Sequence, residues 1–163
     1  MPMSRGESYE WVGWRNDTFG GGAGKPVEMV FEFDTVRNFT SMLLHTNNMF
    51  SKDVQVFVRA SVFFSVGGQH FSGQPVQYSY MPDSIMESAR DVTVKLHNRI
   101  GKYLQVHLYF ALRWIMLSEV SFVSSEYYKQ FHCAIFTPPT LGENSSSRRP
   151  AMCVFQNGSR DFP

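Results

Sequence analysis

The sequence predicts an all-β fold, an antiparallel jelly roll or β-sandwich. Polar and apolar residues alternate along several segments, helical spacing is nearly absent, and loops rich in Gly, Asn, Ser and Pro separate the segments. About six short strands in this arrangement are typical of sandwiches and barrels. The chain has 163 residues, 43% of them hydrophobic, which is enough for one domain with a buried core.

The strands are expected in the following order. The alternating segments are residues 27–33, 39–45, 54–64, 91–97, 103–110 and 114–123, with an edge strand around 76–80 inside a loop-rich stretch at 65–90. A short turn is expected between the first two strands. Residues 47–52 and 98–101 also have the composition of turns.

One domain is expected at residues 9–125, after a disordered leader at 1–8. Residues 126–163 contain Ser and Pro without periodicity, which predicts a disordered C-terminal tail. Cys133 and Cys153, the two cysteines of the chain, both lie in this tail. They allow one bridge or two free thiols, so they do not decide the redox compartment.

Composition argues against several classes of function. A net charge of +1 gives no electrostatic reason to expect binding to nucleic acid or to an anionic membrane. No apolar run is long enough for a membrane helix, and the start lacks the apolar core of a signal peptide. The chain is therefore expected to be either cytosolic or a piece of a longer secreted or membrane protein, without direct membrane insertion.

The sequence also offers no catalytic motif. Residues 20–26, GGGAGKP, lack the first Gly and the final Ser or Thr of a phosphate-binding loop. The histidines have neither an i, i+4 pair nor a Cys partner at zinc spacing. We therefore expect no enzymatic activity and no organic cofactor.

Four asparagines stand in N-x-[ST] sequons, which mark glycosylation sites in secreted proteins. They are Asn16, Asn38, Asn144 and Asn157. Asn38 is expected at the edge of a strand pair. Accidental sequons in a Ser-rich chain are the alternative, but the number of sequons favours an extracellular piece.

Ser118 and Glu119 interrupt the most apolar strand of the chain. A carboxylate there must face solvent, accept hydrogen bonds or bind a cation. Alternation places Glu119 on the face opposite Ser118 and Val120, so an exposed carboxylate is one interpretation. A calcium ligand is the other, because calcium accepts carboxylate and main-chain oxygens from distant segments.

Five segments together resemble one family. They are WVGWRNDT, VEMVFEFDTVRNFTSM, HTNNMF, VTVKLHNRIGKYLQ and WIMLSEVSF, and they occur in the family's order between Tyr9 and Ser125. They resemble the second extracellular, discoidin-like domain of the discoidin domain receptors, which are collagen-activated receptor tyrosine kinases. The resemblance implies a discoidin-like jelly roll on the extracellular side of the plasma membrane. It also implies an N-terminally incomplete domain, because the family's domain begins further upstream.

The resemblance also implies sites. It implies a calcium shell with ligands at Tyr9, Trp11, Ser118 and Glu119, incomplete here because further ligands come from the upstream segment. It implies glycosylation at Asn16 and places the Asn38 acceptor on the outer face of its strand pair. A disulfide of the family joins positions that match Val62 and Val106, so this chain is expected to fill that space with a valine pair.

The resemblance implies a supporting role in collagen-induced receptor tyrosine kinase signalling. The expected partners are the receptor's N-terminal discoidin domain and the receptor homodimer, with collagen contacted only indirectly. The alternative is a stand-alone jelly roll that binds carbohydrate or a lipid head group. That alternative requires exposed aromatic residues at loop tips, for which Phe71, Tyr78 and Tyr80 are the candidates.

Overall fold

The computed structural model describes residues 10–18, 24–71, 73–127 and 152–154. The described elements are β1 (Val12–Arg15), β2 (Val27–Asn48), the 3-10 helix η1 (Phe50–Lys52), β3 (Arg59–Ser65), β4 (Val76–Ser79), β5 (Ser88–Tyr109), β6 (Trp114–Glu126) and β7 (Met152–Val154). All pairings between these strands are antiparallel, which confirms the predicted fold class. No helix in the described ranges is long and apolar enough to cross a membrane.

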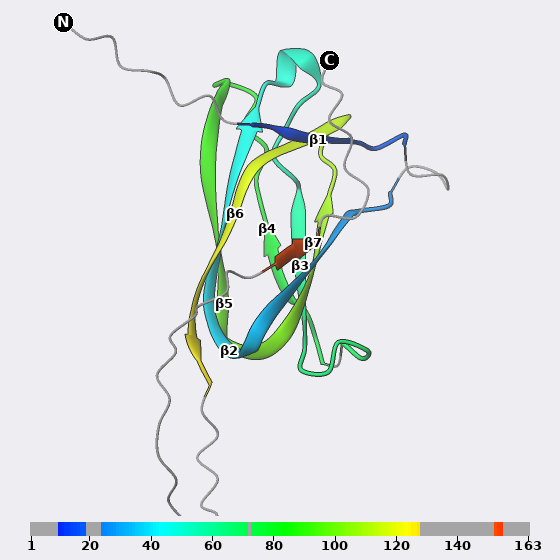
Figure 1. The fold of residues 1–163 in the computed structure, drawn as a ribbon. Helices are drawn as coiled ribbons and strands as arrows, with labels where there is room; N and C mark the ends of the chain where they lie inside the picture. The colour runs from blue at the N-terminus through cyan, green and yellow to red at the C-terminus, as the bar shows by residue number, and fades with distance from the viewer. Residues whose placement is uncertain (1–9, 19–23, 72, 128–151, 155–163) are drawn as a thin grey trace, which may run out of the picture.

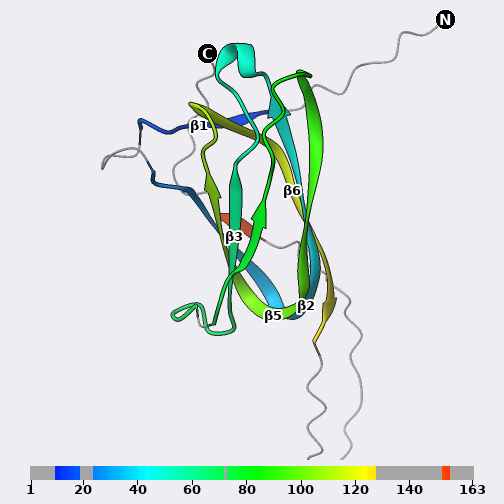
Figure 2. The ribbon, with the colours of Figure 1, turned by 180° about the vertical axis from the view of Figure 1, so that it is seen from behind.

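The strands follow the order β1-β6-β2-β5-β3-β4, and β7 pairs with β2 outside this path. Two long strands, β2 and β5, run alongside each other through both layers of the fold (Figure 1). The first part of β2 pairs with the last part of β5, next to β3 and β4. The second part of β2 lies between β5 and β6. This two-stranded ribbon is folded over at its lower end, so its two halves face each other (Figure 2).

The fold-over has a visible cause in the register of the β2–β5 ladder. Glu32 pairs with Tyr103 and Arg37 with Gly101, so four β2 residues stand opposite the single β5 residue Lys102. Extra residues on one strand bend it and interrupt its pairing. The turn predicted between residues 33 and 39 is therefore wrong: this stretch is a bend inside one 22-residue strand.

A second turn prediction, at residues 98–101, is also wrong. These residues lie inside β5, and the backbone is irregular where the stretch begins, because His97 and Asn98 both have φ of 55°. Asparagine tolerates this left-handed conformation better than most residues. The composition of this stretch therefore indicated an irregular backbone. It did not indicate that the strand continues through the irregularity.

Other boundaries differ in smaller ways. Of the strand predicted at 54–64, only the part from Arg59 is strand, although residues 54–57 are buried. The strand predicted around 76–80 is confirmed as β4. The sequence did not predict β1. It also did not predict β7, which falls in the expected tail, most of which lies outside the described residues.

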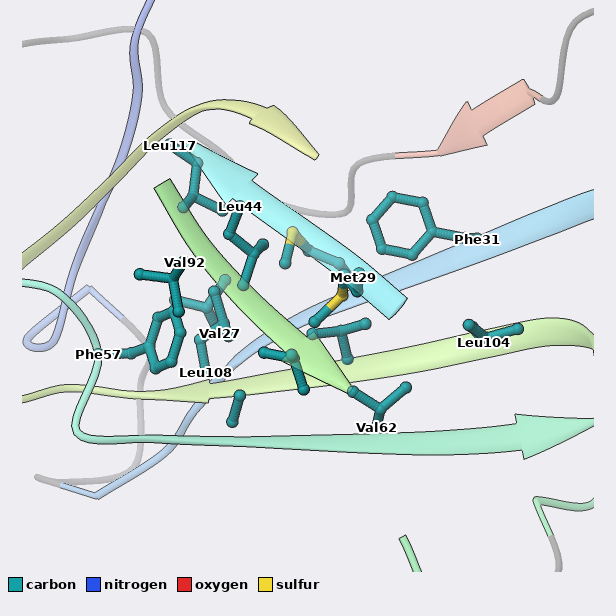
Figure 3. Close-up of a cluster of buried hydrophobic side chains, with 14 of the residues drawn as sticks. Val27, Met29, Phe31, Leu44, Phe57, Val62, Val92, Leu104, Leu108 and Leu117 are labelled. Carbon is teal, nitrogen blue, oxygen red and sulfur yellow. The ribbon is translucent and has the colours of Figure 1, made fainter. Parts of the chain in front are cut away.

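The core lies between the two halves of the ribbon. In one layer, Met29, Val106, Val62 and Val76 form a register row across β2, β5, β3 and β4, and none is more than 8% exposed. Side chains from the other layer, including Leu44, Val92 and Leu117, pack against this one (Figure 3). Burying such alternate residues on both inner faces is the main stabilising contribution in a sandwich.

Aromatic side chains fill the space inside the fold-over. Phe33 and Phe39 flank the bend in β2, and their ring centroids are 4.8 Å apart. Phe122 of β6 makes edge contacts with Phe31, Phe33 and Phe39. Edge-to-face pairs of this kind are worth about 0.5–1.5 kcal/mol each beyond their buried area. The aromatic cluster therefore stabilises the bend where regular pairing is lost.

Candidate functional site

Ser118 is the extra residue of a β-bulge in β6. His45 pairs with Glu119 and the next residue, Thr46, pairs with Leu117, so Ser118 has no register partner in β2. The side chain of Glu119 is exposed, as the alternation predicted, while the Oγ atom of Ser118 is buried. Bulges commonly change the direction of a side chain next to a functional site.

A polar row crosses the outer face of the sheet beside this bulge. His45 lies between its register partners Asp91 and Glu119, and its Nδ1 atom is 2.5 Å from Asp91 Oδ1. The Trp11 ring stacks on the imidazole of His45, with centroids 5.5 Å apart. Cross-strand partners project from the same face, so these side chains gather at one place.

The structure therefore brings together three of the four residues expected to bind calcium. Val12 and Leu117, the chain neighbours of Trp11 and Ser118, are register partners, and the Trp11 ring stacks on His45, the register partner of Glu119. Tyr9, the fourth residue, lies outside the described residues. Within the described part of the chain, no three His, Cys, Asp or Glu residues are grouped so that they could hold a metal ion. Calcium binding here would have to add main-chain and hydroxyl oxygens to the carboxylate of Glu119.

The Oγ atom of Ser118 fits such a role. It is buried and makes no hydrogen bond with the described residues. Buried hydroxyl groups normally have a partner, and calcium accepts hydroxyl, carboxylate and carbonyl oxygens. Ser118, Glu119 and Trp11 can supply only part of the six to eight oxygens that calcium requires.

The two sequons within the described residues differ in their surroundings. Asn16 begins the turn after β1, and its Nδ2 atom is 3.4 Å from the carbonyl oxygen of Leu112. Asn38 lies in the central strand of a ladder, between Ile100 of β5 and Ser125 of β6, so the prediction that it stands at an edge is wrong. Its Oδ1 atom is buried. Asn144 and Asn157 lie outside the described residues.

Val62 and Val106 are direct register partners in the β3–β5 ladder, and both are fully buried. Opposed residues of an antiparallel pair have Cβ atoms about 4.5–5.5 Å apart. This approaches the spacing that a disulfide needs. The geometry is therefore compatible with a cross-strand bridge at these two positions. Whether a bridge was lost here remains a prediction from the resemblance.

The connection between β4 and β5, residues 80–87, carries the most exposed large apolar side chains of the described chain. Met81 is 88% exposed, Ile85 93% and Met86 64%. We refer to residues 80–87 as the apolar loop. The sequence prediction missed it, because strand alternation gives no information about which loop residues remain exposed. The available signal was the stretch MPDSIMES at residues 81–88, in which apolar residues surround the turn-forming residues Pro82 and Asp83 just before a predicted strand.

Buried and half-buried polar side chains hold this loop in place. The Nδ2 atom of Asn48, a residue only 1% exposed, donates to the carbonyl oxygens of Asp83 and Met86 at 2.9 and 2.8 Å. Arg90 donates to the Asp83 carboxylate at 2.9 Å and to the Met86 carbonyl oxygen at 2.9 Å. The loop therefore presents its apolar side chains on a fixed backbone.

The electrostatics of Asp83 reflect these contacts. Its pKa is lowered from 3.8 to about 2, first because Arg90 donates a hydrogen bond to the carboxylate. The backbone N–H groups of Ile85 and Met86 also donate to Asp83 Oδ1, at 2.8 and 3.2 Å. The ionised form of Asp83 thus supports the loop conformation at neutral pH.

The aromatic residues proposed as loop-tip contacts for sugars are placed differently. Tyr78 lies in β4, and both Tyr78 and Tyr80 pack against the core, with rings 6.5 and 6.2 Å from that of Phe57. Phe71 is half-buried. The expectation that Tyr78 and Tyr80 stand at loop tips is therefore wrong.

Comparison with known proteins decides the family. The family described as "Discoidin domain-containing receptor 1/2, DS-like domain" matches residues 2–124. The chain belongs to this family. The chain is 35% identical over 119 residues to the discoidin domain-containing receptor tyrosine kinase B of Caenorhabditis elegans, covering 72% of this chain. It is 35% identical over 117 residues to the rat epithelial discoidin domain-containing receptor 1, covering 71% of this chain.

A third relative, the Caenorhabditis elegans discoidin domain-containing receptor A, is 30% identical over 123 residues. The DS-like chain spans only 12% to 14% of the length of these three relatives. The family match covers a DS-like extracellular domain and does not cover a kinase domain. The resemblance inferred from the sequence motifs is thereby confirmed.

Proposed function

We propose that the chain is a non-catalytic extracellular module of a discoidin domain receptor that supports collagen-induced kinase signalling. The observation that carries the proposal is the family match over residues 2–124, which covers a DS-like domain and nothing else. In this proposal, collagen binds the receptor's preceding discoidin domain. The DS-like module transmits or restrains the geometry of the receptor dimer and does not bind collagen itself.

We further propose that the apolar loop is the surface through which the module contacts the rest of the receptor ectodomain. Exposed apolar side chains on a fixed backbone lose little conformational freedom on binding, which favours association. Met81, Ile85 and Met86 provide such a surface, and Asn48 and Arg90 fix the backbone beneath it. Isolated apolar residues are common on surfaces, but three on one buttressed loop favour a contact site.

Calcium is part of this proposal. Ser118 and Glu119, with the main chains of Tyr9 and Trp11, would hold a calcium ion together with oxygens from other parts of the receptor. A bound ion would tie β1 to the bulge in β6. In support, Ser118 Oγ is buried and has no hydrogen-bond partner within the described residues. We expect weak calcium binding by the chain alone and a loss of that binding in Ser118→Ala, measured by calcium titration.

Glycosylation completes the proposal. We propose that Asn16, at the start of a turn, carries a glycan more readily than Asn38, which lies inside a three-stranded ladder. Peptide mass spectrometry of protein secreted from animal cells measures the occupancy of each site. Higher occupancy at Asn38 than at Asn16 would contradict this assignment.

Two experiments test the receptor role. The purified chain should not bind triple-helical collagen, and measurable binding without any other domain would overturn the proposal. In the full receptor, Ile85→Asp should reduce collagen-induced phosphorylation and leave collagen binding unchanged. Val66→Asp is the matched control, because Val66 is also exposed, at 57%, but lies outside the apolar loop. Equal phosphorylation in the two variants would count against docking through this loop.

A further inference from the structure

A groove of about 610 Å³ lies on the surface of the domain; it includes Tyr80, the first residue of the apolar loop, but neither the exposed Met81, Ile85 and Met86 nor the Ser118 bulge. Four parts of the chain form it: Asn16 in the turn after β1, residues 24–25 before β2, residues 109–112 at and after the end of β5, and residues around the facing ends of β3 and β4. Its lining includes Asn16, Lys25, Arg59, Ser79, Tyr80 and Tyr109. One lining residue, Asn16, is the glycosylation site proposed above, and the receptor role proposed above gives the cations Lys25 and Arg59 no part.

Arg59 is the central cation of the groove. It stands in a register row between Ser79 of β4 and Tyr109 of β5, and its side chain is exposed. Its guanidinium lies over the Tyr109 ring, 4.0 Å from the centroid. A cation–π contact of this kind restrains the guanidinium, while its N–H groups can still donate to a ligand. This is a preorganised site for a carboxylate or sulfate group.

The other lining residues keep the groove positively charged. Lys25 adds a second cation, and none of the described residues that line the groove is acidic. Asp17, the chain neighbour of Asn16, is paired with Arg15 at 2.7 Å and with Arg113 at 3.4 Å. The local field in the groove therefore favours an anion, although the chain as a whole carries a net charge of only +1.

The remaining lining residues suit a sugar. Tyr80 and Phe110 contribute aromatic surface, and Ser79 contributes a hydroxyl. Small-molecule sites typically combine apolar or aromatic walls with a few placed polar groups, as here. We propose that this groove binds an anionic saccharide, whose carboxylate or sulfate group pairs with Arg59 and whose ring packs on the aromatic wall.

The test is titration of the full 163-residue chain, with Asn16 unglycosylated, with three saccharides. They are a sulfated uronate hexasaccharide, a sialylated trisaccharide and a neutral hexasaccharide. At least one of the two anionic saccharides should bind, more weakly as salt rises, and the neutral one should not. The tighter of the two anionic ligands shows whether the natural ligand is a sulfated uronate or a sialylated glycan. Failure of both to bind, or equal binding of the neutral sugar, would overturn the proposal.

Variants locate the site. Arg59→Ala should weaken binding by about tenfold or more, because hydrogen bonds to charged groups contribute at that level. Arg99→Ala is the matched control, since Arg99 also lies over an aromatic ring, that of Phe64 at 5.0 Å, but outside the groove. Equal loss in both variants would indicate non-specific charge attraction and overturn the assignment.

Two additional measurements keep the result interpretable. If Arg59→Ala fails to fold, Lys25→Ala replaces it and should also weaken binding, and unchanged binding would contradict the proposal. An acidic peptide with the same charge as the hexasaccharide should bind at least tenfold more weakly. Equally tight peptide binding would exclude a saccharide as the specific ligand.

Discussion

The support of the apolar loop by Asn48 can be tested with a substitution that preserves shape. Asn48→Asp keeps the size of the side chain and replaces the Nδ2 donor with an oxygen. In the structure that donor lies 2.9 Å from the carbonyl oxygen of Asp83 and 2.8 Å from that of Met86. The residue is 1% exposed, so water has little access to replace the lost hydrogen bonds.

The expected destabilisation follows from these contacts. Each lost hydrogen bond costs about 1 kcal/mol, and the buried carboxylate facing two carbonyl oxygens adds a penalty of similar size or more. The total is about 3 kcal/mol or more. For a domain of this size, 1 kcal/mol shifts the melting temperature by about 2–4 °C. Asn48→Asp should therefore lower the melting temperature by about 6–12 °C.

Asn47→Asp is the matched control. The Oδ1 atom of Asn47 accepts a hydrogen bond from the backbone N–H of Asn48 at 2.9 Å, and an aspartate keeps this acceptor. The same chemical change at the neighbouring residue should therefore have little effect. Thermal unfolding followed by circular dichroism, with limited proteolysis of the apolar loop, measures both variants. Equal stability of the two variants would refute the support assigned to Asn48.

Three further predictions concern stability. The pKa of Asp83 in the folded chain is about 2, below its ordinary 3.8. The contribution of ionised Asp83 to folding stability should therefore be complete above about pH 4 and lost as the pH falls toward 2. Asp83→Asn should flatten the dependence of the melting temperature on pH in this range. Val62→Cys with Val106→Cys should form a disulfide, detected as a cross-linked peptide by mass spectrometry, and stabilise the chain by about 2–4 kcal/mol. Free thiols at positions 62 and 106 in the oxidised protein would contradict the register. Phe39→Ala should cost about 3–5 kcal/mol in urea unfolding, because Phe39 is 0% exposed at the centre of the aromatic cluster; a loss below about 1 kcal/mol would show that the cluster does not stabilise the bend.

Much of the fold could be predicted from alternation. Val92, Val94 and Leu96 alternate cleanly, and all three are buried as the pattern requires. The continuity of β2 and β5 could not be predicted, because polar residues such as Asp34 at the bend have the composition of a turn. β1 was missed because four residues that include Gly13 give too short a pattern. The local sequence thus identified the strand segments. It did not show that some of these segments continue into one another as single long strands.

The sites were less predictable for a related reason. The Ser118 bulge becomes visible only when the register of β6 against β2 is known. The groove around Arg59 joins residues as distant in the chain as Lys25 and Tyr109. The apolar loop depends on the buried side chain of Asn48, which composition assigns to a turn. Each site is produced by tertiary contacts between segments that look unremarkable when taken alone.

The docking role of the apolar loop is tested most directly by methionine oxidation footprinting. The isolated chain and the full receptor ectodomain are treated with the same oxidant, and Met29 and Met42, 1% and 0% exposed, serve as slow internal references. We predict that Met81 and Met86 react rapidly in the isolated chain and become protected in the ectodomain. Equal rates at these two methionines in both proteins would contradict a contact between this loop and the rest of the receptor.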